Sequence, residues 1–227
     1  MTAVKAYISS VSPTCKRVFA ALHYKDIPHE RIEIDISKKH HERPTEFQRI
    51  SPHGKVPAIE HDGTVVYEST VINEYFEEVF PQRPMLPKEV GRRAYARDWI
   101  KYSDSQLQDL DASMVHGVRE KDGKIKVCRQ ILSNLAVLDR ELEGKQHYFL
   151  GEELSLVDAA LAPTLRLVPL WSRLIGDEAT WKQYKHVQAY LDRLAEHPSI
   201  AAAVNDTPMD VYEGFFGAVL VQGMTFP

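Results

Sequence analysis

The stretch SPTCKRV, residues 12–18, marks the point where a predicted strand gives way to a predicted helix. Residues 3–8 favour a strand, and residues 13–24 carry apolar side chains at helical spacing. Ser12 followed by Pro13 is a strong signal for the start of a helix. The unpaired N–H groups and the positive dipole end of such a helix suit a bound anion or thiolate, although Ser12 taken alone is more simply interpreted as a cap.

The rest of the N-terminal region continues to alternate strands and helices. Asp62-Gly63 is a strong hairpin signal between two short strands. The elements predicted after the first helix are a strand at 29–36, a less regular stretch, strands at 56–60 and 65–67, and a helix at 69–80. This order predicts an α/β domain over residues 1–80.

Three prolines, at 81, 84 and 87, lie among charged residues and predict a linker over residues 81–88. Beyond it, strand signals nearly vanish, which predicts an all-α domain over residues 89–227. Ser155 and Asp158 form a capping box at the start of one helix, in which Pro163 should cause a kink. The predicted helices cover residues 89–110, 125–142, 156–173, 181–196 and 199–205, with a charged turn at 119–124.

Composition excludes several classes of function. The 28 Lys and Arg residues are scattered against 32 Asp and Glu residues, for a net charge of −4, which argues against a nucleic-acid partner. The most apolar long run, 156–171, contains Asp158 and Arg166, so no membrane helix is expected. The N-terminus lacks the apolar core of a signal peptide, and we expect a cytoplasmic protein. Two cysteines, Cys15 and Cys128, are too few for a disulfide framework or a zinc site, and no metal is expected.

Two further features point to ligand binding. In SPHGKVPA, residues 51–58, Pro57 interrupts the start of a strand; a cis Val56–Pro57 bond would leave the Val56 main chain free to pair with an extended peptide. At the junction of the next strand and helix, Ser69 is a natural cap with a second anion site, and Glu68 suits an ammonium group. A loop proline, a cap and a surface acid are the simpler interpretations of each feature alone.

Together, two helix N-termini and one exposed strand backbone fit an extended tripeptide with a thiol at one end and a zwitterionic amino acid at the other. That description matches glutathione. Over nearly its whole length the chain resembles the cytosolic glutathione transferase superfamily. Residues 12–18 are similar to the Ser-x-x-x-x-Arg-Val of the serine-type tau, phi and zeta classes. Three further family motifs appear in order, at residues 51–57, 68–69 and 155–158.

The resemblance implies a thioredoxin-like N-terminal domain that binds glutathione and an all-helical C-terminal domain. It assigns Ser12 as the donor to the glutathione sulfur, not as a nucleophile. The remaining implied glutathione contacts are Val56 before a cis Pro57 for the cysteinyl backbone, Glu68 and Ser69 for the γ-glutamyl group, Lys55 for the glycyl carboxylate, and one basic residue among Lys39, His40 and His41.

The resemblance also implies a reaction and its partners. The thiolate attacks a small hydrophobic electrophile, as in detoxification, and two copies of the chain form a homodimer. The electrophile is not named by the sequence. Candidates for its pocket, by position in the family, are Trp99, Tyr102, Gln106, Trp171, Tyr212, Phe215 and Phe216, although aromatic residues at helical spacing are usually core.

Two alternatives stay open. In cysteine-type relatives the nucleophilic cysteine falls at the position of Ser12, and Cys15 takes the second position of the motif. Cys15 shares an apolar stripe with Val18, Phe19 and Leu22, which favours a packed core residue. A glutathione-dependent isomerase or a thiol-disulfide reductase on the same fold is the nearer alternative. A non-catalytic binding module is the more distant one.

Overall fold

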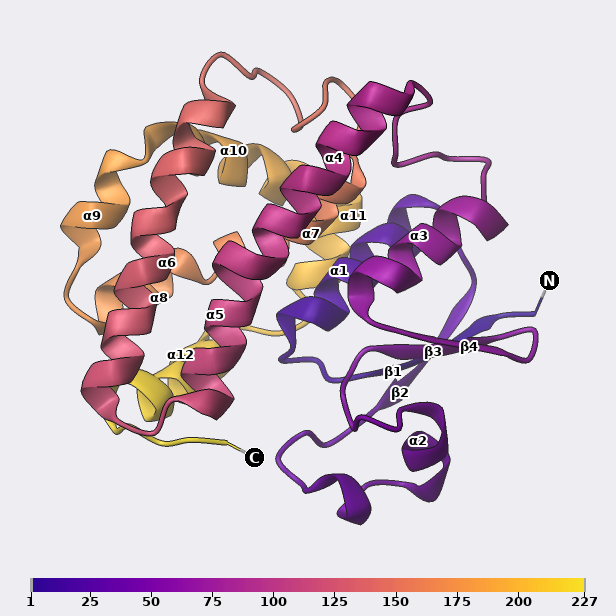
Figure 1. Cartoon of the computed structure of the whole chain (residues 1–227), viewed down its shortest axis with the longest axis horizontal. Helices are drawn as coiled ribbons and strands as arrows, with labels where there is room; N and C mark the ends of the chain where they lie inside the picture. Colours follow the sequence, from indigo (N-terminus) through magenta and orange to yellow (C-terminus); the bar gives the residue numbers. More distant parts are fainter. Residues whose placement is uncertain (1, 227) are drawn as a thin grey trace.

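The computed structural model describes residues 2–226 and shows a small sheet domain beside a larger helical domain (Figure 1). The segment that connects the two domains, residues 80–89, contains prolines and charged residues. The sheet domain consists of β1 (Val4–Ile8), α1 (Pro13–Tyr24), β2 (His29–Glu33), a 3-10 turn η1 (His40–Glu42), α2 (Thr45–Ile50), β3 (Ala58–His61), β4 (Thr64–Tyr67) and α3 (Ser69–Val79).

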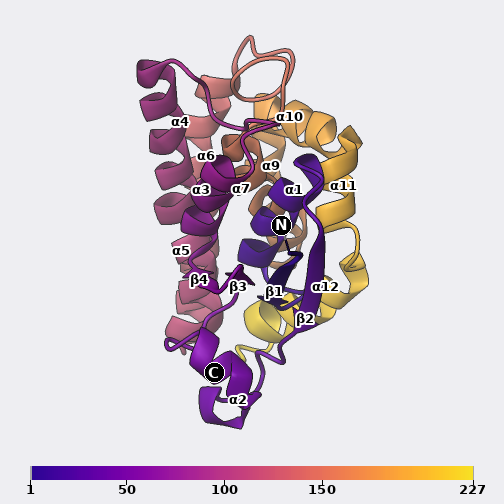
Figure 2. The ribbon, with the colours of Figure 1, turned by 90° about the vertical axis from the view of Figure 1, so that its right-hand side faces the viewer.

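The four strands form one mixed sheet in the order β2-β1-β3-β4. β1 pairs with β2 in parallel and with β3 antiparallel, so Tyr7 lies between Ile32 and Ala58. α1 and α3 cover the face that meets the helical domain, and α2 covers the opposite face (Figure 2). On the α2 side, Tyr7 packs with Phe47 and Ile50. The parallel β1–α1–β2 unit places the N-terminus of α1 at the end of β1.

The helical domain begins with one long helical run and continues with shorter helices. The run is α4 (Val90–Ser103), which passes through two π-helical turns around α5. The other elements of this domain, in chain order, are η2 (Asp104–Gln108), α5 (Asp109–Ala112), η3 (Ser113–Gly117), α6 (Lys121–Leu142), α7 (Leu156–Leu165), α8 (Val168–Leu174), α9 (Glu178–Gln183), α10 (Lys185–Glu196), α11 (Pro198–Val204), α12 (Met209–Phe216) and η4 (Gly217–Val221).

Several predicted boundaries differ from the structure. The run predicted to end at residue 110 continues to Gly117, and the predicted turn at 119–124 already contains the first turn of α6. The helix predicted at 156–173 is broken between α7 and α8, because Pro163 and Pro169 remove two N–H groups from the helical ladder. The helix predicted at 181–196 is divided between α9, which begins at Glu178, and α10; the break is at Tyr184, whose backbone is not helical (φ −86°, ψ 72°).

The predicted capping box is present at the start of α7 and is buried. The Asp158 carboxylate accepts hydrogen bonds from the Ser155 N–H at 2.7 Å and the Phe149 N–H at 2.8 Å. It also accepts the Tyr190 hydroxyl at 2.5 Å. The box therefore ties α7 to α10 and to the loop before α7, in addition to capping a helix.

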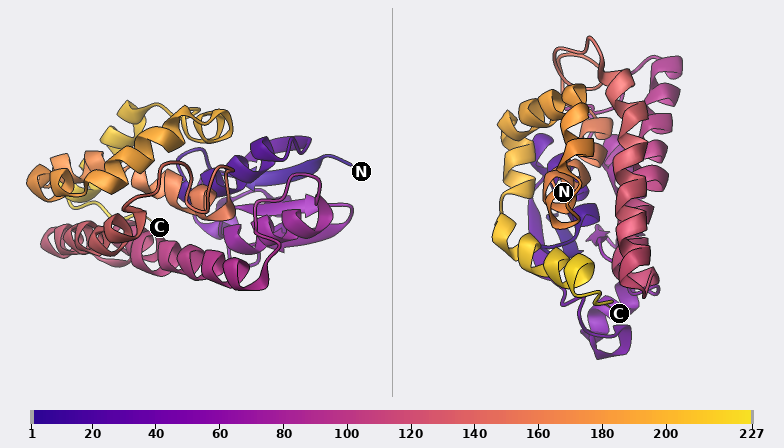
Figure 3. Two further views of the ribbon diagram at one scale, coloured as in Figure 1. Left: turned by 90° about the horizontal axis from the view of Figure 1, so that it is seen from above. Right: turned by 90° about the vertical axis from the view of Figure 1, so that its left-hand side faces the viewer.

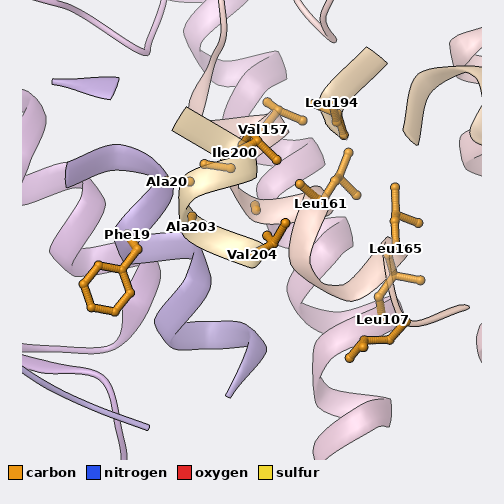
Figure 4. Close-up of a cluster of buried hydrophobic side chains, with 14 of the residues drawn as sticks. Phe19, Ala20, Leu107, Val157, Leu161, Leu165, Leu194, Ile200, Ala203 and Val204 are labelled. Carbon is orange, nitrogen blue, oxygen red and sulfur yellow. The ribbon is translucent and has the colours of Figure 1, made fainter. Parts of the chain in front are cut away.

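One hydrophobic core runs through both domains. α1 packs against α7 and α11 as well as against the sheet. Figure 4 shows Ala20 of α1 close to Ile200 and Ala203 of α11, where small side chains allow the two helices to approach. Seen from above, the two domains lie side by side and the C-terminal end of the chain returns to their junction (Figure 3). In residues 2–226, no helix combines the length and the apolar character that crossing a membrane requires.

Candidate active site

Ser12 is the cap residue of α1, yet its hydroxyl does not cap the helix. Its backbone is extended (φ −85°, ψ 120°), and its carbonyl accepts from the N–H groups of Cys15 and Lys16. Within the described chain, the hydroxyl bonds no N–H of α1; its oxygen lies 2.8 Å from the Thr14 hydroxyl oxygen instead. The capping interpretation therefore does not account for Ser12, which presents a hydroxyl beside the positive end of the helix dipole.

Val56 lies directly across from this helix end. The Thr14 hydroxyl donates to the Val56 carbonyl at 3.2 Å, which joins the start of α1 to the loop before β3. The Val56–Pro57 bond is cis, as predicted. The Ser51 hydroxyl donates to the Lys55 carbonyl at 2.7 Å and holds the turn that leads to Val56.

Glu68 and Ser69 form the second helix end of the site. Glu68 is exposed and has a left-handed backbone (φ 70°), a costly conformation for a residue with a side chain and one that concentrates at ligand clamps. Ser69 is buried and is the first residue of α3. The strained backbone of Glu68 thus lies directly before a helix N-terminus, and a site that binds a charged ligand group can combine these two features.

An ion pair between Arg17 and Asp104 connects α1 to the start of α3. Arg17 of α1 is 2% exposed, forms an ion pair with Asp104 and donates to the Ser103 hydroxyl at 3.0 Å. Thr70, next to Ser69, donates to the same Asp104 at 3.2 Å. Because one carboxylate binds both α1 and α3, these contacts fix the spacing between Ser12 and Ser69. Asp104 is distant in sequence from both helices, and no sequence pattern pointed to it.

The predicted basic residues lie around the loop at 51–57. Lys39, His41 and Lys55 are exposed, whereas the His40 ring is half-buried and stacks edge-on against Phe47. Gly54 has a left-handed backbone (φ 67°), and a Cβ there would lie 2.9 Å from the His40 ring. The His40 Nδ1 is buried and has no partner in residues 2–226. Of the three basic residues considered for the glycyl carboxylate, His40 is therefore the one that packs against the loop at 51–57.

Cys15 is fully buried at the start of α1. Its sulfur accepts the Ser9 N–H at 3.4 Å, and burial raises the pKa of the thiol to about 11. Only the thiolate is a good nucleophile, so a neutral, inaccessible Cys15 is unsuited to attack a disulfide. These observations favour the interpretation of Cys15 as a packed core residue.

A pocket of about 460 Å³ lies at the β1–α1 loop, where Ser9 and Val11, but not Ser12, belong to its lining. Its lining comes from four separate parts of the chain: the β1–α1 loop, the end of β2 with the segment after it, η3, and the C-terminal region. The lining is mainly apolar, with two carboxylates on the side of β2. Among the described lining residues there is no lysine or arginine. The lining residues are Ser9, Val11, Glu33, Ile34, Asp35, Ile36, Ser37, His116, Phe215 and Phe226.

Only Phe215 among the predicted second-substrate residues lines this pocket. Tyr212 lies close by, since its hydroxyl is 3.4 Å from the Ser10 carbonyl, but its side chain is buried. Both residues belong to α12, a helix where the sequence had indicated only a tail.

The other predicted residues lie away from the pocket, and we leave them out of it. Trp99 packs on Phe149 at 5.1 Å, and the Tyr102 hydroxyl donates to Asn134 of α6. Trp171 packs on Phe216 at 5.1 Å. Trp99 and Trp171 are buried because aromatic side chains on the inner face of an amphipathic helix pack into the core, and the half-buried Tyr102 packs against that core. Gln106 is half-buried and joins α6 through the side chain of Asn134.

Nine of the ten lining residues were not predicted for the pocket, and Phe215 is the exception. Val11 is a single apolar residue in the β1–α1 loop. Ile36 was expected at the end of a strand, whereas β2 ends at Glu33 and Ile36 lies in the turn that follows. Phe226 is near the C-terminus; its N–H donates to the Val115 carbonyl at 3.3 Å, and its carbonyl lies 3.2 Å from His116 Nδ1. Its ring stacks on Phe215 at 4.6 Å. The C-terminal segment is thereby held over η3 and closes one side of the pocket.

These features define a class: a thioredoxin-like domain in which two helix N-termini and the loop before a strand lie together, with an apolar pocket made jointly with a helical domain. The family model described as glutathione S-transferase, N-terminal domain, matches residues 11–79, and the one for the C-terminal domain matches residues 94–193. The chain belongs to the glutathione S-transferase family.

Individual relatives agree with this assignment. Glutathione S-transferase 1 of Dianthus caryophyllus is 32% identical over 168 residues, covering 71% of this chain and 76% of its own length. A probable glutathione S-transferase of Nicotiana tabacum is 35% identical, with 70% and 67% covered. The crystal structure of glutathione transferase Omega 3C from Trametes versicolor superposes with a TM-score of 0.77 at 27% identity and covers 95% of this chain and 91% of its own.

Proposed function

We propose that this protein conjugates glutathione to a small hydrophobic electrophile, with Ser12 as the hydroxyl that stabilises the thiolate. The observation that carries the proposal is the Ser12 hydroxyl. It does not cap its own helix, it contacts Thr14, which binds the Val56 carbonyl, and it follows Val11, which lines an apolar pocket. A thiol at this point would be next to both a hydrogen-bond donor and a second substrate.

The glutathione peptide would lie across the two helix ends. The cysteinyl main chain would pair with Val56, and the γ-glutamyl carboxylate would meet the N-terminus of α3 at Ser69, with Glu68 facing its ammonium group. The glycyl carboxylate would lie among Lys55, His40 and their basic neighbours Lys39 and His41. The α3 N-terminus, Glu68 and the basic residues would each complement a charge of opposite sign on the peptide, and Val56 would pair with its neutral main chain.

The energy that thiol activation requires is modest. A free thiol has a pKa near 8.5, and lowering it by about two units needs roughly 2.7 kcal/mol. A hydrogen bond to a charged group contributes about 1.5–3 kcal/mol, and a helix N-terminus about 0.3–1 kcal/mol. Ser12 and α1 together therefore reach the required order of magnitude without a metal or a further base.

The electrophile that fits the pocket is apolar and uncharged. Val11, Ile36 and the stacked pair Phe215 and Phe226 supply apolar contact. Asp35 and Glu33 place two carboxylates at the rim, and Lys38, whose Nζ lies 3.9 Å from Asp35, offsets part of their charge. We expect the remaining negative charge to disfavour a carboxylate-bearing substrate. This charge balance supports conjugation of neutral electrophiles over isomerisation of an organic acid, and the burial of Cys15 disfavours the reductase alternative.

The test of the proposal has two stages. Retention on immobilised glutathione and elution by free glutathione would measure binding; failure to bind would remove the proposal and support a non-catalytic module. A substrate panel would then compare 1-chloro-2,4-dinitrobenzene with isomerase substrates and with a mixed disulfide. We expect conjugation to be the fastest reaction, and a faster isomerase or reductase reaction would contradict it.

We also propose a homodimer in which the sheet domain of one protomer faces the helical domain of the other. Val65, Tyr67 and Val71 expose apolar surface on β4 and α3, and Val137 does so on α6. A specific interface between these faces would bury more than about 1,000 Å². Sedimentation at micromolar concentration would test this, and the mass of one chain with full activity would contradict it.

A further inference from the structure

The Thr14 hydroxyl connects two parts of the proposed glutathione site that the sequence analysis treated separately. Its oxygen lies 2.8 Å from the Ser12 hydroxyl oxygen, and it donates to the Val56 carbonyl at 3.2 Å. A hydroxyl has one hydrogen, and a carbonyl oxygen only accepts. When the Thr14 hydrogen is donated to Val56, the Ser12 hydroxyl is the donor of the shorter contact, and its hydrogen points at Thr14.

A ligand at Val56 would change this arrangement. A peptide N–H that donates to the Val56 carbonyl competes with the Thr14 hydroxyl for the same oxygen. The Thr14–Val56 contact is the longer and hence the weaker of the two, so it is the one to give way. The freed hydrogen can then turn toward Ser12, and the Ser12 hydrogen can turn toward the sulfur.

We propose that Thr14 is a positioning residue that couples recognition of the peptide main chain at Val56 to activation of the thiol at Ser12. Both hydroxyls rotate and keep their own hydrogens; the thiol proton leaves to solvent. The resulting chain runs from Thr14 to Ser12 to the thiolate, and each donor polarises the next. The inference rests on the proposed function, because it requires Ser12 to face the glutathione sulfur.

The position of Thr14 suits this role. It is the second residue of α1, half-buried, and fixed by the proline before it and the buried Cys15 after it. Its β-branched side chain has few χ1 rotamers, which keeps the hydroxyl between Ser12 and Val56. A threonine whose only task was to begin a helix would not need both partners.

Two matched variants test the coupling. Thr14→Val keeps the shape and removes the hydroxyl, and Thr14→Ser keeps the hydroxyl. The pKa of bound glutathione would be measured from the ultraviolet absorbance of its thiolate as a function of pH. We expect Thr14→Val to raise this pKa and to lower the conjugation rate at neutral pH by about three- to tenfold, the value of one neutral hydrogen bond. The rate should recover at high pH, and Thr14→Ser should restore it at neutral pH.

A binding measurement separates this effect from loss of structure. S-methylglutathione has no ionisable thiol, so its affinity should change less than about twofold in Thr14→Val if the peptide site is intact. A glutathione analogue with an ester in place of the γ-glutamyl-cysteine amide lacks the N–H that would displace Thr14. With that analogue, the wild type and Thr14→Val should differ less than they do with glutathione.

The outcomes are distinct. If Thr14→Val titrates bound glutathione like the wild type, or if Thr14→Ser behaves like Thr14→Val, the coupling is overturned. If the ester analogue preserves the full difference, the role assigned to the peptide N–H is overturned. Failure of the proposed function would look different: Ser12→Ala itself would leave the thiol pKa unchanged.

Discussion

The two halves of the proposed active site are built in different ways. The proposed glutathione side consists of main-chain groups and short polar side chains held at helix ends: Ser12 on α1, Val56 before β3, and Ser69 on α3. The proposed second-substrate side consists of apolar side chains brought together from loops and from the C-terminal segment, such as Val11 and Phe226. A backbone-based site fixes one ligand in one pose, whereas a side-chain pocket can change its substrate by single substitutions without altering the fold.

The largest effect should come from the glutathione side. Ser12→Ala should lower kcat at neutral pH by about ten- to a hundredfold, because it removes one hydrogen bond to a charged sulfur. Glutathione affinity should change much less, since the peptide contacts remain. Steady-state kinetics with a titration of the bound thiol would measure both.

Cys15→Ala is the matched control for this variant. Trimming a buried side chain should cost some stability and leave turnover nearly intact. If Cys15→Ala abolished activity while Ser12→Ala retained it, the glutathione side would depend on a thiol instead of a hydroxyl. Mass spectrometry would then detect a mixed disulfide with glutathione.

The helical domain carries a buried acid whose effect should be seen in stability. Asp111 on α5 receives the Gln108 amide at 3.3 Å, and its second carboxylate oxygen has no partner among residues 2–226. Burial raises its pKa to about 7, against the opposing effects of Gln108 and Arg17. Above the unfolded-state pKa the unfolded chain releases this proton first, so stability falls as pH rises from about 4 to about 7.

Asp111→Asn should remove this slope. We expect it to raise the free energy of unfolding at about pH 8 by about 2 kcal/mol and to change it little at about pH 4. Denaturant unfolding at both pH values would measure the difference. Asp109→Asn, on the exposed side of the same helix, is the control; an equal gain in that variant would show a general charge effect instead.

The pocket side should respond to loss of an aromatic wall. Phe226→Ala removes the ring that stacks on Phe215, and should lower kcat/KM for 1-chloro-2,4-dinitrobenzene by about tenfold, as expected for losing about 1.5 kcal/mol of apolar contact. The KM for glutathione should stay within about twofold. Val221→Ala, an exposed residue of η4, is the control. An equal loss in both variants would mean that the C-terminal region matters only for folding.

The two halves of the proposed site differ in how much of their structure could be predicted from the sequence. Ser12-Pro13, Val56-Pro57 and Asp62-Gly63 are local signals, in which a cap, a proline or a hairpin turn restricts the backbone directly. Together with the family resemblance, they were sufficient to predict the sheet domain and the cis bond at Pro57. Asp104 and Phe226 have no such signal, because each reaches the site only through the packing of distant segments.

The helical domain shows the same limit in its core. Trp99 and Trp171 were proposed for the pocket from their positions along the chain, and the structure places both in the interior. Hydrophobic periodicity identifies an inner face, but it does not say whether that face meets another helix or a cavity. The breaks around Pro169 and Tyr184 likewise depend on how the following segments dock.

The smallest effect concerns charge at the pocket rim. Asp35 is exposed, and one of its carboxylate oxygens accepts the Ser37 N–H at 3.0 Å and the Ser37 hydroxyl at 2.5 Å. Asp35→Asn keeps an acceptor oxygen for these bonds and removes the charge. Ethacrynic acid and its methyl ester form a matched pair of electrophiles that differ in one carboxylate. We expect the variant to raise kcat/KM for the acid relative to the ester by about twofold at low salt, and the gain to vanish at high salt. Asp192→Asn, an exposed acid on α10, should leave the ratio unchanged. A gain of the same size in both variants would mean that net charge steers the acid, and the pocket side would then lack the local charge selectivity that sets it apart from the glutathione side.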